Sequence, residues 1–169
     1  MVKQELGAFF GPRRLYFVCG KVYKDLSYAN KVVHWFVQHK LPVMPVTPTG
    51  GQVDLTTDSF TQTVTELPKL SVFESIAAGL SQYPAKKAID GISVCFVTPP
   101  PITLSILEQL QTAPFSVQSV WFQPGSWDLK CIECAEQKLH IDKSKVINDC
   151  VLVKGDSYFA KSELPLNSS

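Results

Sequence analysis

The hydrophobic positions of the chain form short runs, and each run breaks into a turn. β-Branched and aromatic residues fill these runs, and stretches with the spacing of amphipathic helices separate them. Short apolar runs that alternate with helical stretches are typical of a parallel sheet whose strands are joined by crossover helices. We predict strands at 15–19, 41–46, 91–97 and 117–122, and a fifth strand at 146–153.

The stretches between the predicted strands indicate helices on both faces of the sheet. Ser27 is a suitable N-cap for the clearest helix, and the residues that follow it form a broad apolar face. The predicted helices cover 2–10, 28–39, 72–80, 103–112 and 127–139. The expected organisation is a single α/β domain over 1–155, with an irregular insertion at about 52–90 and a C-terminal tail at 156–169.

Composition and charge narrow the class of protein. The 169 residues are 45% hydrophobic and 18% charged, which fits one globular domain. A net charge of +1 gives no global field for nucleic acid or an acidic membrane, and no apolar run is long enough to span a bilayer. The odd number of cysteines and a start without a basic and apolar leader favour reduced thiols in the cytoplasm.

The turns that follow the predicted strands are the strongest indication of function. In parallel sheets, ligands bind beyond the carboxyl ends of the strands, at the point where the topology changes direction. The turns therefore converge on one crevice, and they favour a nucleotide-type ligand more strongly than any particular reaction. The candidate residues are Gly20, Lys21 and Ser27 in the first turn, Thr47, Pro48, Gly50 and Gly51 in the second, Thr98, Pro99 and Pro100 in the third, and Gln123, Pro124 and Gly125 in the fourth.

Two of these turns indicate particular chemistry. The first turn has the elements of an anion site, namely a strand, a glycine, a loop and a helix start, and Lys21 and Lys24 would add charge to it. A tight turn with two solvated lysines would have the same sequence pattern. The sequence Gly-x-Gly-x-x-Gly of dinucleotide sites is absent. The prolines at 99–101 predict a rigid wall with few donors, suited to a flat ring or a pantetheine arm, or simply a stiff loop before a helix.

Other reactive residues point to packing more than to chemistry. Cys131 and Cys134 lack a second pair of ligands at zinc spacing, and the three histidines have no evident nucleophile or metal beside them. Cys150 could face the crevice, but a buried cysteine beside the last strand is the simpler interpretation. The sequence therefore predicts neither a metal site nor a catalytic group.

Several short motifs, taken in order, resemble a known family. The segment Val46-Thr-Pro-Thr-Gly-Gly51 is similar to its second-strand turn, and Phe96-Val-Thr-Pro-Pro-Pro101 to its proline-rich third turn. Val120-Trp-Phe-Gln-Pro-Gly125, the pair Ser27-Tyr28 and the closing Asn148-Asp-Cys150 also have counterparts there. From about Leu15 to Val153, the chain resembles the small CoA-binding proteins of the Rossmann type, related to the CoA-binding domain of the succinyl-CoA synthetase α subunit.

The resemblance implies a Rossmann-like sheet of about five strands in the order 3-2-1-4-5, and a module that binds CoA or an acyl-CoA without catalysis of its own. Lys21 departs from the family, which has a small residue and serine there, and 52–90 is longer than the usual link. Two alternatives stay open: a small NAD(P)-binding oxidoreductase, and a scaffold that has lost its ligand and binds a protein through 52–90. We expect neither a nucleic acid nor a membrane as partner.

Overall fold

The computed structural model describes residues 9–11, 13–22, 27–48, 50–54, 69–82, 89–113 and 116–160. Its centre is a five-stranded parallel sheet in the order β2-β1-β5-β6-β7. The strands are β1 (Arg14–Cys19), β2 (Val43–Val46), β5 (Gly91–Phe96), β6 (Val117–Phe122) and β7 (Val146–Ile147). A separate antiparallel pair consists of β3 (Gly51–Asp54) and β4 (Lys69–Val72). The predicted α/β class with a Rossmann-like parallel sheet is confirmed.

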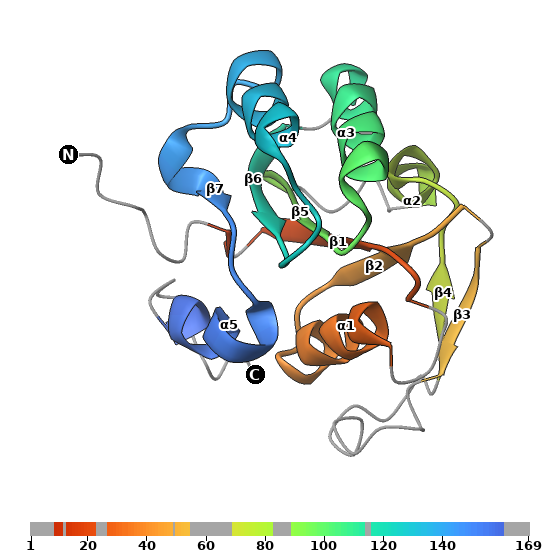
Figure 1. Cartoon of the computed structure of the whole chain (residues 1–169). Coiled ribbons are helices and arrows are strands. Elements are labelled where there is room, and N and C mark those ends of the chain that lie inside the picture. Colours follow the sequence, from red (N-terminus) through yellow and green to blue (C-terminus); the bar gives the residue numbers. More distant parts are fainter. Residues whose placement is uncertain are drawn as a thin grey trace.

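Helices cover both faces of this sheet, so the domain has three layers (Figure 1). One face carries α2 (Ile76–Gln82), α3 (Pro100–Gln109) and α4 (Leu129–Glu133), and the other carries α1 (Tyr28–Gln38) and α5 (Val151–Ala160). Side chains alternate along β1 between two apolar cores, with Tyr16 on the side of α1 and Phe17 on the side of α2. This period of two buries both faces of a strand in a parallel sheet.

The strand order differs from the predicted 3-2-1-4-5 in the place of the third predicted strand. The strand predicted at 91–97 does not lie beside β2, since β5 pairs with β1 from Arg14↔Gly91 to Cys19↔Phe96. The outer edge of β2 instead meets Phe73, whose N–H donates to the Pro45 carbonyl at 2.9 Å. In the numbering of the predicted strands, the central sheet has the order 2-1-3-4-5, and the segment 69–73 meets the outer edge of β2 through one bridge.

Pro45 gives a physical reason for the short pairing at this edge. A proline has no N–H, so it cannot donate to a neighbouring strand and is tolerated only where the ladder is incomplete. The contact is a single bridge between Val46 and Phe73, closed by Thr47 N–H donating to the Phe73 carbonyl at 2.9 Å. β4 therefore pairs mainly with β3, and the helix predicted at 72–80 begins only at Ile76.

The strand predicted at 146–153 is wrong beyond its first residues. β7 ends at Ile147, and Val151–Ala160 is the helix α5. The apolar run Val151-Leu-Val153 resembles a strand, but only Val151 is buried, while Leu152 and Val153 are exposed. Gly155 and the half-buried Phe159, four and eight residues after Val151, complete an inner face at helical spacing against α1.

The other helices differ from their predictions mainly at the ends. The helix predicted at 127–139 is α4 followed by a π-helical turn, Cys134–Lys138, and the helix predicted at 103–112 starts at Pro100 and closes in a 3-10 turn. The helix predicted at 2–10 falls outside the described residues except for Phe9 and Phe10, which are buried and not helical. Within the described ranges, no helix has the length and apolar character needed to cross a bilayer.

Candidate functional site

The four predicted turns lie side by side at the carboxyl edge of the sheet. The first residue after each of three strands donates its N–H to the last residue of a neighbouring strand. Gly20 donates to Val46 at 3.1 Å, Val97 to Cys19 at 2.8 Å, and Gln123 to Phe96 at 3.0 Å. These bonds extend the ladder by one step and place the starts of the four turns in one row.

The first turn is held to α1 by its own hydrogen bonds. The Ser27 hydroxyl accepts from Asn30 N–H at 3.1 Å as N-cap and donates to the Lys21 carbonyl at 3.0 Å. A Cβ at Gly20 would lie 3.1 Å from the Cβ atoms of both Ala29 and Val97, closer than most such contacts, so glycine lets the helix lie this close to the sheet without displacing them. Lys21 is exposed, and the first turn of α1 carries no acid, which favours an anion there. Lys24 lies outside the described residues.

The second turn exposes backbone beside the first. Thr47 is buried, and its carbonyl accepts from Gly50 N–H at 2.9 Å, which closes the turn around the exposed Pro48. Gly50 and Gly51 have φ angles of +67° and +116°, a region that glycine adopts without strain. A Cβ at Gly51 would meet nothing within 4 Å, so the backbone there is open to approach.

The third turn presents an apolar wall. Pro99, Pro100 and Pro101 carry no N–H, and the next two amides, of Ile102 and Thr103, already donate to the Pro99 carbonyl at 3.0 and 2.9 Å. The Thr103 hydroxyl lies 2.6 Å from the Thr98 hydroxyl and is buried with it. No backbone N–H at positions 99–103 is therefore free to bind a ligand. An ordinary helix N-terminus, by contrast, has several unpaired N–H groups.

The fourth turn places Gln123 inside the protein. Its side-chain oxygen accepts from the Tyr28 hydroxyl and from Val151 N–H, both at 2.8 Å, and its amide nitrogen donates to Cys95 Sγ at 3.2 Å. Gln123 is fully buried, while Pro124 and Gly125 are exposed. The backbone of Gly125, not the side chain of Gln123, is thus the open part of this turn, and a Cβ there would meet nothing within 4 Å.

Tyr28 and Cys150 form a contact that the sequence did not predict. The Tyr28 hydroxyl lies 2.7 Å from Cys150 Sγ, although the residues are 122 positions apart. Tyr28 and Cys150 belong to two separate sequence motifs, and no spacing connects the two. Among the five cysteines, all of them described and all free, only Cys150 is incompletely buried.

The chain matches the CoA binding domain family over residues 14–156. It belongs to this family. The match covers every strand of the central sheet and all four turns of the candidate site. No curated protein matches the chain.

Solved structures share this fold at low sequence identity. A Thermus thermophilus protein is 19% identical with a TM-score of 0.63, and the match covers 94% of this chain and 100% of that one. A hypothetical protein from Pyrococcus horikoshii OT3 is 18% identical with a TM-score of 0.60, covering 87% and 84%. A conserved hypothetical protein from Pyrococcus furiosus is 20% identical with a TM-score of 0.52, covering 83% and 98%. At these identities the likeness shows the fold alone.

Burial raises the pKa values of two thiols and one tyrosine hydroxyl beneath the carboxyl edge of the sheet. It raises the pKa of the Cys95 thiol to about 12 and also raises the pKa of the Cys19 thiol. The pKa of the Tyr28 hydroxyl is raised first by desolvation and then by the hydrogen bond with Cys150. Cys131 and Cys134 are buried as expected for packing, and the described residues include no group of three or more side chains placed to hold a metal ion.

Alkaline pH is expected to destabilise the domain through the buried thiols of Cys19 and Cys95. In the folded protein, the pKa values of both thiols lie above the ordinary pKa of a thiol in the unfolded chain. Their contribution to stability is therefore complete below the unfolded pKa, and it is lost as the pH rises from the unfolded toward the folded pKa. Raising the pH from about 8 to about 10 should lower the free energy of unfolding by about 1–2 kcal/mol per thiol. Urea unfolding of the wild type and of Cys95→Ala measures this, and the variant should lose less stability over the same range. An equal loss in both proteins would contradict the role of Cys95.

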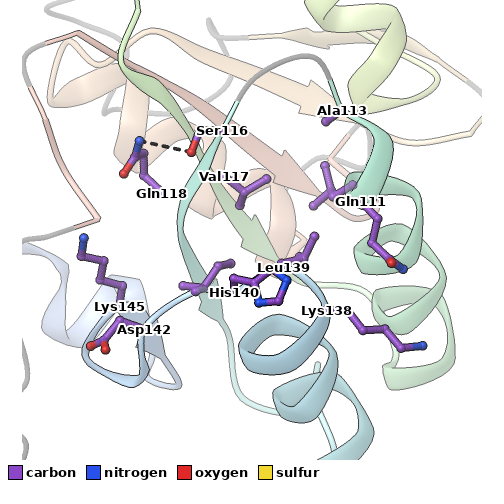
Figure 2. A pocket seen from close by; sticks show the side chains of 12 residues that line it. Gln111, Ala113, Ser116, Val117, Gln118, Lys138, Leu139, His140, Asp142 and Lys145 are labelled. Atoms are coloured by element: carbon purple, nitrogen blue, oxygen red, sulfur yellow. Dashed lines mark hydrogen bonds between the residues drawn. The ribbon is translucent and has the colours of Figure 1, made fainter.

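A separate cavity of about 490 Å³ lies at the opposite end of β6 (Figure 2). Ser116, Val117 and Gln118 line it from the start of that strand. Lys138 lines it from the end of the π-helical turn, and His140 and Asp142 from the connection that follows. Asp142 is the N-cap of the 3-10 turn Lys143–Lys145, and its carboxylate accepts from Ser144 N–H at 3.0 Å. None of the thirteen predicted site residues lines this cavity.

Proposed function

We propose that this CoA-binding domain binds CoA or an acyl-CoA and has no catalysis of its own. The observation that carries the proposal is the division of the carboxyl edge into two chemically different halves. The first turn has an exposed lysine and a helix start without acids, while the third has proline carbons and no free N–H from its first positions. CoA has the matching division, with charged phosphates at one end and a long, uncharged arm at the other.

In this proposal each turn contacts one part of the ligand. Gly20 and Lys21 hold phosphate, and Ser27 fixes the carbonyl of Lys21. Thr47, Pro48, Gly50 and Gly51 border the adenosine and ribose. Thr98, Pro99 and Pro100 wall the pantetheine arm, and Pro124 and Gly125 close the far side over the buried Gln123.

The polar side chains of the four turns support binding more than catalysis. Ser27, Thr98 and Gln123 are engaged in the internal hydrogen bonds described above. Of the thirteen candidate residues only Lys21 carries a charge. A general acid or base must be free to exchange a proton with a substrate, and these engaged groups hold the loops in place instead.

Native mass spectrometry of freshly purified protein, followed by calorimetric titration, tests the proposal. The ligands are CoA, acetyl-CoA, NAD and NADP. Saturable binding of CoA or acetyl-CoA alone supports it. Binding of NAD or NADP instead would favour the oxidoreductase, and binding of none of the four would favour the scaffold.

Replacing Lys21 with alanine is expected to weaken CoA affinity by about 1–2 kcal/mol, roughly five- to thirtyfold, because a charged bond to phosphate is lost. Calorimetric titration measures the change. Lys143→Ala is the matched control, since this exposed lysine lies in the 3-10 turn before β7, at the opposite end of the sheet. Unchanged affinity in Lys21→Ala would remove this side chain from the site.

A further inference from the structure

Exposed apolar side chains gather at the carboxyl edge of the sheet. Among the described residues, the large hydrophobic side chains that are more than a third exposed are Ile102 (48%), Leu129 (73%), Leu152 (36%) and Val153 (73%). Each lies within the first three residues of a helix that follows a strand of the central sheet, namely α3, α4 or α5. Single exposed apolar residues are common on any protein, but their restriction to one end needs a reason.

The residues on α3 and α4 belong to neighbouring helix starts. The two helices lie next to each other on one face of the sheet (Figure 1), and Cys131 Sγ in α4 donates to the Pro100 carbonyl in α3 at 3.5 Å. We use the term apolar lip for Pro101 and Ile102 of α3 together with Trp127, which is half-buried, and Leu129 of α4. The lip directly continues the third and fourth turns of the candidate site.

The backbone of the lip has little left to offer a polar ligand. The amides of Ile102 and Thr103 are bonded to the Pro99 carbonyl, and Cys131 N–H donates to the Asp128 carboxylate at 3.1 Å. The Asp128 carboxylate is exposed, and its pKa is lowered chiefly by the hydrogen bond from Cys131 N–H, so it is ionised at neutral pH. This negative charge at the start of α4 disfavours a second anion. The segment of ligand that fits the lip is therefore uncharged and apolar.

From these observations we infer that the apolar lip binds the acyl chain of a CoA thioester, so that the domain prefers acyl-CoA with a chain of several carbons over free CoA. The inference rests on the proposed function. A pantetheine arm that follows Thr98–Pro100 ends beside Pro101 and Ile102, where the thioester and its chain emerge. The chain then covers side chains that are otherwise exposed to water, which is favourable in proportion to the apolar area removed from solvent.

Affinity should rise with chain length. Complete burial of a methylene strengthens binding roughly fourfold, and on an open lip about half of that area is covered, which gives roughly twofold per methylene. Calorimetric titration with CoA, acetyl-CoA, butanoyl-CoA, hexanoyl-CoA and octanoyl-CoA measures the slope. CoA and acetyl-CoA should bind within about twofold of each other, and octanoyl-CoA, which is six methylenes longer, about sixtyfold tighter than acetyl-CoA. The half-buried Trp127 supplies an independent readout, since its fluorescence should change with octanoyl-CoA and not with CoA.

Surface variants locate the chain. Leu129→Ser and Ile102→Ser should each weaken octanoyl-CoA several-fold and leave CoA affinity unchanged, because neither side chain supports the core. Val153→Ser is the matched control, with the same exposure as Leu129 but on α5 at the opposite face of the sheet. An equal effect of Val153→Ser would overturn the assignment to the lip. Equal affinity for all chain lengths would overturn the inference and leave the proposed function intact, whereas binding of neither CoA nor any thioester would overturn both.

Discussion

Gln123→Leu is expected to lower the free energy of unfolding by about 3 kcal/mol, because leucine fills a similar volume and leaves buried polar groups without partners. The side chain of Gln123 is fully buried and joins three elements that are distant in sequence. It accepts from Tyr28 at the start of α1 and from Val151 N–H at the start of α5, and it donates to Cys95 in β5. The loss at Val151 matters most, since that amide is buried at a helix start.

Urea unfolding at neutral pH measures the effect of Gln123→Leu. Tyr28→Phe is the matched control, because it removes one of the two donors to the same oxygen and should cost only about 1 kcal/mol. If both variants unfold at the same urea concentration, the bond to Val151 contributes little and Gln123 does not anchor α5. CoA affinity should also fall in Gln123→Leu, because the exposed Pro124 and Gly125 are positioned by this buried side chain.

Arg14→Met is expected to destabilise the domain by about 3 kcal/mol, the lower end of the range for breaking a buried ion pair. The Arg14 side chain is only 8% exposed and forms a bidentate pair with Asp90, with N···O distances of 2.8 and 3.2 Å. It also donates to Ser93 Oγ at 2.8 Å and to the Phe9 carbonyl at 3.1 Å. One guanidinium thus connects the segment before β1 to the starts of β1 and β5.

Thermal and urea unfolding of Arg14→Met, compared with Arg13→Met, tests this role. Arg13 is exposed, so its replacement should change stability by less than about 0.5 kcal/mol. Asp90→Asn should have a smaller effect than Arg14→Met, because the asparagine oxygen can still accept from the guanidinium, which also keeps its bonds to Ser93 and Phe9. A loss in Arg14→Met no larger than in Arg13→Met would show that the pair contributes no net stability.

The central strands could be predicted closely because their signal is local. The predicted strands at 15–19, 91–97 and 117–122 agree with β1, β5 and β6 to within one residue at each end. Each is an apolar run that stops at a glycine, a proline-rich turn or Gln123-Pro-Gly. Ser27 is the N-cap of α1, as expected from its hydroxyl and the helix that follows. These features depend on residues a few positions apart.

The predictions failed where an apolar run had two possible structures. The composition of Val151-Leu-Val153 favours a strand, yet this segment begins α5. Val151 N–H donates to the Gln123 side-chain oxygen, and the inner face of α5 packs against Trp35 at Gly155. The segment 69–73 was not predicted as a strand, and it is one because β4 pairs with β3 and Phe73 forms a bridge with Val46. In both cases the deciding partner lies far away in the sequence, and local propensity cannot represent it.

The sequence by itself determined which residues end the strands, and therefore which turns form the candidate site and that their third member is an apolar, proline-rich wall. Only the tertiary structure decided how those residues are used. Gln123 was expected to face the ligand with the others, but packing turned its amide inward to Tyr28, Val151 and Cys95. The reason is physical: turn and capping preferences act over a few bonds of backbone, whereas a buried polar side chain points toward whatever partner the folded core brings within hydrogen-bonding distance.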